Sequence, residues 1–171
     1  MSEQISPGLA KLFMTSLLLF ASAVAQAGVL TDFSGAPRSI NDYTGNGKWL
    51  VVMFWASDCH VCGKEAPEYI SFHSKNKDGN AHVLGISIDG LANKDAAQGF
   101  IDEHKLNFPN LIGTGEDIGA MYYELTGEFW VGTPTFFVYD PKGELRAAQA
   151  GAVPAEILEN FITENNVAAA E

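Results

Sequence analysis

The sequence contains few cysteines and few basic residues. Only two of its 171 residues are cysteines, Cys59 and Cys62, which excludes a disulfide-framework protein and a four-cysteine zinc site. Ten Lys and Arg stand against 21 Asp and Glu, so the formal net charge is −11. Because binding to nucleic acid or to anionic lipid relies on Lys and Arg, this charge argues against both kinds of partner.

The rest of the composition is that of an ordinary globular protein. The sequence is 47% hydrophobic and 18% charged, which excludes disordered, collagen-like and coiled-coil architectures. Its length fits one domain with a sizeable core, and we find neither an internal repeat nor a low-complexity linker.

Residues 1–27 have the pattern of a secretory signal peptide. Lys11 precedes an apolar run at 12–20, and the small residues that follow contain two A-x-A sequences. We favour cleavage after Ala27. A retained membrane anchor is the alternative, because residues 12–31 are uncharged and about 20 apolar residues span a bilayer. Either interpretation places residues 28–171 outside the cytoplasm, and we expect the periplasm, where a disulfide can persist.

Apolar runs predict the strands. The continuous apolar and β-branched segments at 49–55 and 82–88 are typical of strands buried on both faces, and a shorter apolar piece occupies 110–112. Turn residues predict β-hairpins at 29–46 and 135–149.

Helical periodicity occurs at 61–75, at 93–105, at 117–125 and after Pro154. The side chains expected to face inward in the third helix are Ile118, Met121, Tyr122 and Leu125. Those expected to face inward in the last helix are Ile157, Leu158, Phe161 and Ile162. Strands that alternate with helices, followed by a hairpin and a helix, predict an α/β fold with a mixed central sheet flanked by helices.

The two cysteines lie where the buried strand 49–55 gives way to a helix. Unpaired amides and the helix dipole at this position stabilise a thiolate at Cys59, and the C-x-x-C spacing brings Cys62 within disulfide reach. Such a pair can attack a target disulfide through Cys59 and resolve the mixed disulfide through Cys62. The alternative is an inert bridge, but a loop of two residues constrains the unfolded chain little. We therefore predict a redox-active pair.

Residues 54–67, FWASDCHVCGKEAP, resemble the active-site segment of the thioredoxin superfamily, in particular the exported thiol-disulfide oxidoreductases of the TlpA/ResA type. A second segment, VGTPTFF at 131–137, is similar to the cis-proline loop of that family. The resemblance extends from about Leu30 to Ile162. It implies a thioredoxin-like fold with an N-terminal β-hairpin and an extra helix–strand insertion. It also implies a protein disulfide oxidoreductase that needs no cofactor or metal beyond its redox-active Cys59–Cys62 disulfide.

The resemblance also implies roles for single residues. Cys59 would be the nucleophile and Cys62 the resolving thiol. Pro134 would be the cis-proline, with the backbone of Thr133 available to pair with a substrate strand. Glu65 matches an acidic residue that would take and return the proton of the resolving thiol, although a solvated helix residue is the alternative.

Four further residues are assigned to the active-site loop and to substrate contact: Trp55, Asp58, His60 and Val61. Asp58 and Val61 depart from the family, which usually has Trp and Pro at these positions. Like-charge repulsion from Asp58 disfavours a Cys59 thiolate, whereas a protonated His60 favours it. The sequence leaves open which effect prevails, and a disulfide oxidase or isomerase remains the alternative to the reductase that the subgroup implies.

The implied partners are cysteine-containing exported proteins and a membrane dithiol electron donor. A copper-handling protein of the same fold is a further alternative, although its cysteines would be one residue further apart. A peroxiredoxin would carry Pro and Thr where this sequence has Val52 and Ala56. Phe129 and Trp130 either line a substrate patch or pack in the core.

The remaining histidines are not assigned to the active site. His73 and His82 are expected at the surface or at a strand edge, and His104 at the end of a helix.

Overall fold

The computed structural model describes residues 30–168. The signal peptide predicted for residues 1–27 lies outside these residues. Within residues 30–168, no helix is both long and apolar enough to cross a membrane.

The centre of the fold is a mixed sheet of seven strands in the order β2-β1-β5-β4-β3-β6-β7. The strands are β1 (Leu30–Asp32), β2 (Pro37–Arg38), β3 (Trp49–Trp55), β4 (Ala81–Ser87), β5 (Asn110–Ile112), β6 (Thr135–Tyr139) and β7 (Leu145–Ala150). β3 pairs in parallel with β4 and antiparallel with β6. All seven residues of β3 are buried because strands flank it and helices cover both faces, which explains its continuous apolar sequence.

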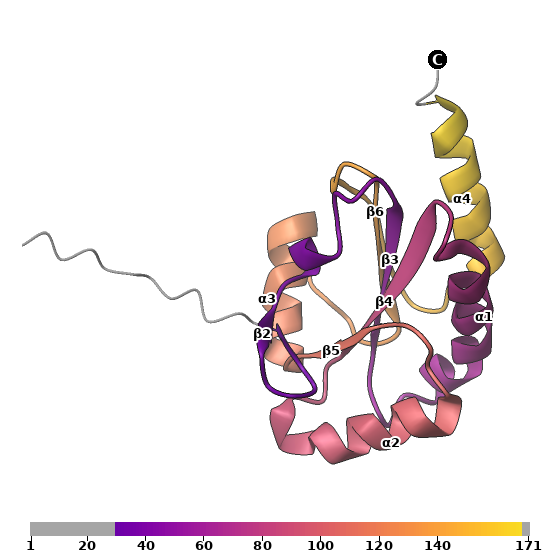
Figure 1. Cartoon of the computed structure of the whole chain (residues 1–171). Helices are drawn as coiled ribbons and strands as arrows, with labels where there is room; N and C mark the ends of the chain where they lie inside the picture. Colours follow the sequence, from indigo (N-terminus) through magenta and orange to yellow (C-terminus); the bar gives the residue numbers. More distant parts are fainter. Residues whose placement is uncertain (1–29, 169–171) are drawn as a thin grey trace, which may run out of the picture.

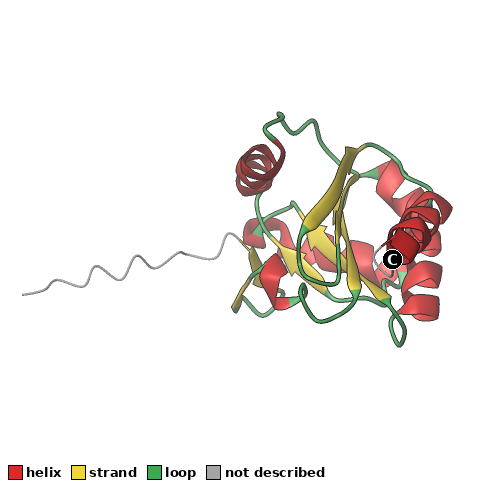
Figure 2. Cartoon of the chain, turned by 90° about the horizontal axis from the view of Figure 1, so that it is seen from above, coloured by secondary structure: helices red, strands yellow, loops and turns green. Residues whose placement is uncertain are grey.

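Helices cover both faces of this sheet. They are α1 (His60–Asn76), α2 (Lys94–His104), α3 (Gly115–Thr126) and α4 (Ala155–Ala168), with short 3-10 helices η1 (Ile40–Asp42) and η2 (Leu91–Asn93). α1 and α4 lie together on one side and α3 on the other (Figure 1). Seen from above, helices lie on both sides of the sheet (Figure 2).

Alternate residues of β3 enter two different cores. Val51, Met53 and Trp55 join the core under α1, α2 and α4, whereas Val52 and Phe54 join the core under α3 and η1. This is the period of two expected for a strand that is covered on both faces.

The sheet and its helices include the two features that the family resemblance implies, an N-terminal hairpin and an extra helix–strand insertion. β1 and β2 form the N-terminal hairpin, and β1 joins the sheet by antiparallel pairing with β5. The extra helix–strand insertion is α2 with β5, between β4 and α3. Both predicted features of the fold are therefore confirmed.

Three predicted side-chain positions were wrong: two residues expected to face inward are exposed, and one expected at the surface is buried. Leu125, in the last turn of α3, is 46% exposed, and Ile157, in the first turn of α4, is 57% exposed. Each helix buries only a narrow stripe, which ends before Leu125 in α3 and follows Leu158 and Ile162 in α4. His73 is buried rather than at the surface, because its Nδ1 accepts the Val83 amide of the neighbouring strand at 3.1 Å.

Candidate active site

Several loops meet at one end of the sheet. Trp55 pairs with Ser87 and Ser87 with Ile112, so the parallel strands β3, β4 and β5 end side by side. Because β6 is antiparallel, the pairing of Phe54 with Thr135 brings its beginning to the same end. The loop before Cys59 and the loop around Pro134 are therefore neighbours, and we call this part of the molecule the loop end of the sheet.

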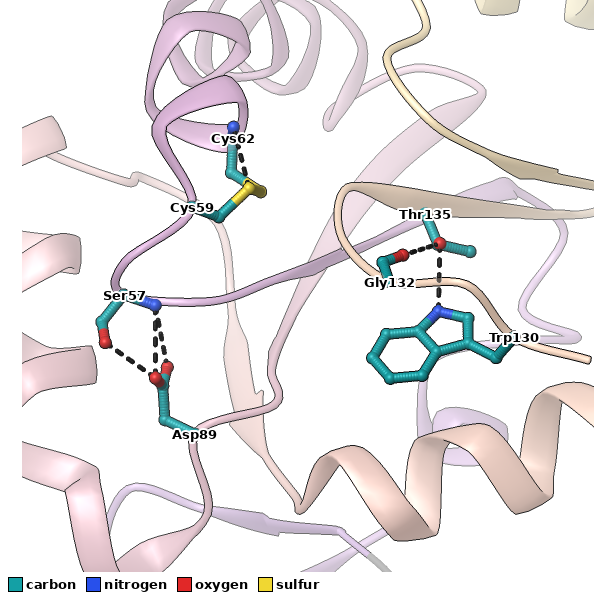
Figure 3. Close-up of a disulfide and its surroundings, with 7 residues drawn as sticks. All are labelled: Ser57, Cys59, Cys62, Asp89, Trp130, Gly132 and Thr135. Atoms are coloured by element: carbon teal, nitrogen blue, oxygen red, sulfur yellow. Dashed lines mark hydrogen bonds between the residues drawn. A yellow bond between two sulfur atoms is a disulfide. The ribbon is translucent and has the colours of Figure 1, made fainter.

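Cys59 and Cys62 form a disulfide at the first turn of α1 (Figure 3). Cys59 is the N-cap residue, and its Sγ accepts the Cys62 amide at 3.2 Å. The Cys59 side chain is partly exposed, whereas Cys62 is completely buried. A partner sulfur can therefore approach Cys59 but not Cys62. Once the bridge is opened, the same amide and the helix dipole stabilise a thiolate at Cys59.

The carboxylate of Asp89, two residues after the end of β4, fixes the loop before Cys59. Asp89 accepts the Ser57 amide at 3.0 and 3.3 Å and the Ser57 hydroxyl at 2.7 Å. It also accepts the Ser87 hydroxyl at 2.6 Å. Figure 3 shows the Asp89 carboxylate facing Ser57, one turn of chain before the disulfide. Bonds to a charged acceptor are the stronger kind, so Asp89 holds the segment that carries the nucleophile.

The loop before β6 is held from inside by Trp130. The Thr133–Pro134 peptide bond is cis. The Trp130 indole N–H donates to the Thr135 hydroxyl at 3.1 Å, and that hydroxyl donates to the Gly132 carbonyl at 2.6 Å (Figure 3). Two bonds thus tie the residues on either side of Pro134 to one half-buried tryptophan.

Glu65 is a buried carboxyl group on α1, three residues after Cys62. Its side chain lies on the same helical face as Cys62, and the residue is 8% exposed. Burial raises its pKa to about 7, an effect opposed by hydrogen bonding to the Val153 backbone and reinforced by the nearby Glu68. Its Oε2 atom makes no hydrogen bond within the described chain. Such a group is poised to exchange a proton near neutral pH.

The other predicted residues separate into rim and core. Asp58 and His60 are exposed and Val61 is 43% exposed, so all three border the disulfide at the surface. Trp55 does not belong with them. It has no exposed surface, stacks on Phe100 at a centroid distance of 4.6 Å and donates its indole N–H to Asn110. It therefore supports the loop from the core and does not contact a substrate.

Sequence reasoning missed Asp89 and the contact between Gly63 and His104. A Cβ atom on Gly63 would lie 2.8 Å from Cε1 and 2.9 Å from Nε2 of His104, so α2 packs directly on the first turn of α1. The Ser87-x-Asp89 pattern at the end of a buried strand was a usable signal for the first. Nothing in the sequence indicated the second. Among residues 30–168, no group of three or more His, Cys, Asp or Glu is arranged to hold a metal ion.

A disulfide at the start of the helix that follows the buried strand β3 of this sheet defines the thiol-disulfide oxidoreductases with a thioredoxin-like fold. The sequence profile of the AhpC/TSA family matches residues 22–148, and the chain belongs to that family.

Similar proteins agree with this class. Thiol-disulfide oxidoreductase ResA of Bacillus thuringiensis (strain Al Hakam) is 28% identical over 135 residues, which cover 78% of this chain and 72% of that protein. The thioredoxin domain of a thiol-disulfide oxidoreductase from Bacteroides vulgatus has the same fold, with a TM-score of 0.62, 24% identity and coverage of 80% and 95%. A secreted disulfide oxidoreductase of Mycobacterium tuberculosis has a TM-score of 0.55, 28% identity and coverage of 74% and 88%. The protein is an oxidoreductase of this thiol-disulfide class, with Cys59 and Cys62 as its C-x-x-C pair.

Proposed function

We propose that the protein reduces disulfides in cysteine-containing exported proteins in the periplasm. The observation that carries this proposal is the asymmetry of the disulfide at the start of α1, where Cys59 is accessible and Cys62 is not. The resemblance to the exported subgroup and the apolar N-terminal segment support export. The similar protein from Mycobacterium tuberculosis is described as secreted.

The reaction consists of two exchanges that balance in sulfur and electrons. The Cys59 thiolate attacks one sulfur of the substrate disulfide, whose bond breaks, and the displaced substrate thiolate takes up a proton. The Cys62 thiolate then attacks Sγ of Cys59, which forms the Cys59–Cys62 bond and releases the second substrate thiolate. Two electrons have passed from the protein to the substrate. We propose that a membrane dithiol donor returns them.

Glu65 would serve the second exchange as a proton acceptor. Cys62 is buried and must lose its proton before it can attack, and a carboxylate on the same face of α1 can accept that proton. A pKa of about 7 makes Glu65 both a competent base and a competent acid at neutral pH. The backbone of Thr133, next to the cis peptide bond, would pair with an extended substrate segment.

The trapping of mixed disulfides tests this function. Cys62→Ser, produced as the full chain in the periplasm, should accumulate mixed disulfides with cysteine-containing partners. Cys59 still attacks the substrate disulfide, but no second thiol is present to resolve the mixed disulfide. Cys59→Ser is the matched control and should trap none. If neither variant traps a partner and the wild-type protein instead binds Cu(I) tightly, the proposal fails and a copper-handling role takes its place.

The equilibrium of the Cys59/Cys62 couple with glutathione tests the direction. A reductase should have a potential near that of thioredoxin, about −270 mV, whereas a value near about −120 mV would identify an oxidase. We do not propose a peroxidase, because Val52 and Ala56 occupy the positions where a peroxiredoxin carries Pro and Thr.

A further inference from the structure

Two large apolar side chains are exposed to solvent next to the loop that contains Pro134. Phe129 is 84% exposed and Val131 is 82% exposed. The Phe129 ring stacks on Tyr123 of α3, itself 51% exposed, at a centroid distance of 5.3 Å. Trp130 between them points inward, towards Thr135. Tyr123, Phe129 and Val131 thus expose their side chains while the intervening Trp130 points inward, and we call these three residues the aromatic ridge.

The ridge is a fixed surface rather than a frayed loop. The Gly127 amide closes the end of α3 on the Tyr123 carbonyl at 2.8 Å, and the Glu128 amide donates to the Thr126 hydroxyl at 3.1 Å. The ring of Trp130 lies close to Gly115 and Gly119 of α3, since a Cβ atom on either glycine would be 3.7 Å from it. Leaving a Phe or Val side chain in water forfeits about 1.5 to 3 kcal/mol of burial, so a rigidly displayed pair is typical of a binding surface.

The ridge is continuous with the site of disulfide exchange. An extended chain spans at most about 3.6 Å per residue. The Cα atom of Val131 therefore lies within about 7 Å, and that of Phe129 within about 14 Å, of the Cα atom of Thr133. Within residues 30–168, the amides of Phe129, Val131 and Thr133 donate no hydrogen bond. The free amides of Val131 and Phe129 can therefore receive a segment that pairs with Thr133 and extends beyond it, across the bend that the positive φ of Gly132 makes in this stretch.

The surroundings of the ridge are acidic. No Lys or Arg occurs between Lys105 and Lys142. Glu124 follows Tyr123 and Glu128 precedes Phe129, and both are exposed. Neither forms an ion pair within the described residues. A partner that covers the apolar surface would therefore bring its flanking side chains next to uncompensated negative charge.

We propose that the aromatic ridge binds an extended segment of the substrate polypeptide that carries a bulky apolar residue between basic residues, two to four positions from the reactive cysteine. This inference rests on the proposed function and names the sequence that its substrates share. The apolar residue contacts Phe129 and Val131, and its basic neighbours pair with Glu124 and Glu128. A second copy of this chain is a poorer occupant, because it brings the same acidic residues and a net charge of −11 to the interface.

Reduction of synthetic cyclic peptides by the reduced full-length protein tests the proposal. Each peptide contains one disulfide and, three residues from one cysteine, the sequence Lys-Phe-Lys, Lys-Ser-Lys or Glu-Phe-Glu. Hydroxyethyl disulfide is the small reference substrate, and peptide dithiol is measured by chromatography after acid quenching. We expect the Lys-Phe-Lys peptide to react roughly tenfold faster than either other peptide, which corresponds to about 1.4 kcal/mol.

Two double variants separate the apolar from the acidic contribution. Phe129→Ser with Val131→Ser should bring the rate ratio of Lys-Phe-Lys to Lys-Ser-Lys close to one. Glu124→Gln with Glu128→Gln should bring the ratio of Lys-Phe-Lys to Glu-Phe-Glu close to one and weaken its salt dependence. The matched control is Ile157→Ser, an exposed apolar residue on α4 at the other face of the sheet, which should keep both ratios.

The outcomes distinguish the two proposals. If hydroxyethyl disulfide and all peptides remain oxidised, the proposed function fails. If all are reduced but the peptide rates are equal, or unchanged in both double variants, the ridge is not a substrate-binding surface and only the present inference fails. A concentration-dependent dimer that Phe129→Ser with Val131→Ser abolishes, or binding of the full chain to phosphatidylglycerol vesicles through the same residues, would assign the ridge to a different occupant and overturn it.

Discussion

Glu65 is the residue at which burial and chemistry are most closely connected. A carboxyl group whose pKa burial has raised to about 7 changes its charge across the range in which thiols also titrate. The same residue on a solvated helix would be ionised throughout that range. The buried position, which the sequence left open, is therefore the feature that suits Glu65 to proton transfer with Cys62.

We predict that Glu65→Gln slows the resolution of the mixed disulfide on the order of a hundredfold, because the glutamine cannot accept the Cys62 proton. The inflection near pH 7 in the rate of this step should also disappear. Single-turnover release of substrate thiol, followed from about pH 5 to about pH 9, measures both effects. Glu103→Gln, an exposed residue of α2, is the control. An unaltered pH profile in Glu65→Gln would show that another group takes the proton.

Asp89 acts on the nucleophile indirectly, through Ser57. Asp89→Ala removes an acceptor of both Ser57 bonds and of the Ser87 hydroxyl bond, and we expect a loss of about 1 to 3 kcal/mol in the free energy of unfolding. The loop should also open locally, so that the Ser57 amide exchanges its hydrogen faster in Asp89→Ala than in the wild type. Hydrogen exchange resolved by residue measures this. Asp95→Ala, an exposed acid on α2, is the control. Equal protection of Ser57 in Asp89→Ala and in the wild type would refute the positioning role.

At the scale of helices, α2 and the first turn of α1 are fitted to each other. His104, the last residue of α2, lies on Gly63 and packs against Phe100 at a centroid distance of 4.3 Å. Phe100 in turn stacks on Trp55. The insertion thus contributes a column of rings that supports the strand and the helix on either side of the disulfide loop.

We predict that Gly63→Ala destabilises the protein by about 1 to 3 kcal/mol, because the new methyl group displaces the His104 ring from Phe100. In a His104→Ala background the same change should instead stabilise by up to about 1 kcal/mol, the ordinary helix preference of Ala over Gly. Urea unfolding of the four proteins measures the reversal of sign. Gly99→Ala is the control, since a Cβ atom there meets nothing within 4 Å and should stabilise in both backgrounds. A cost of Gly63→Ala that persists without His104 would mean that other atoms cause the clash.

How far the sequence predicts such elements depends on the range of the contacts involved. β3 has the bounds that its apolar run predicts, because a strand covered on both faces must be apolar at every position. The sequence left open whether Phe129 and Trp130 line a substrate patch or pack in the core. In the structure Phe129 is exposed and Trp130 points inward. Leu125 has the helical phase of the buried residues Ile118 and Tyr122 but lies in the exposed last turn of α3, whereas Ile157 lies off the face of α4 that buries Leu158 and Ile162. Periodicity gives the phase of a helix but not the extent of its partner.

For the whole molecule, the site is assembled from loops that are far apart in sequence. The position of Cys59 follows from local patterns, because a strand, a C-x-x-C pair and a helix are consecutive. The pairing of Ser57 with Asp89 and the contact of Gly63 with His104 follow only from the order of strands in the sheet. These long-range contacts, together with the burial of Glu65, are the part of the site that the sequence could not specify.

Burial of titratable groups also determines how the stability of the whole protein depends on pH. Burial raises the pKa of Glu65 to about 7 and lowers the pKa values of His73 and His82 below their usual value. A carboxyl group with a raised pKa stabilises the fold fully at low pH, and this contribution is lost as the pH rises from about 4.5 to about 7. The histidines have the opposite effect. Their neutral forms fit the core, so their contribution is present above pH 6.5 and is lost as the pH falls.

We therefore predict that the oxidised wild-type protein loses on the order of 1 to 3 kcal/mol of stability relative to Glu65→Gln between about pH 4.5 and about pH 7. The comparison isolates Glu65, because both proteins contain the same histidines and their opposing contributions cancel. Urea unfolding of the two full-length chains at a series of pH values gives the difference directly. Glu103→Gln should run parallel to the wild type throughout, since this exposed carboxyl group has no burial to relieve. If Glu65→Gln also runs parallel, Glu65 is solvated in the folded protein, and the proton transfer assigned to it loses its physical basis.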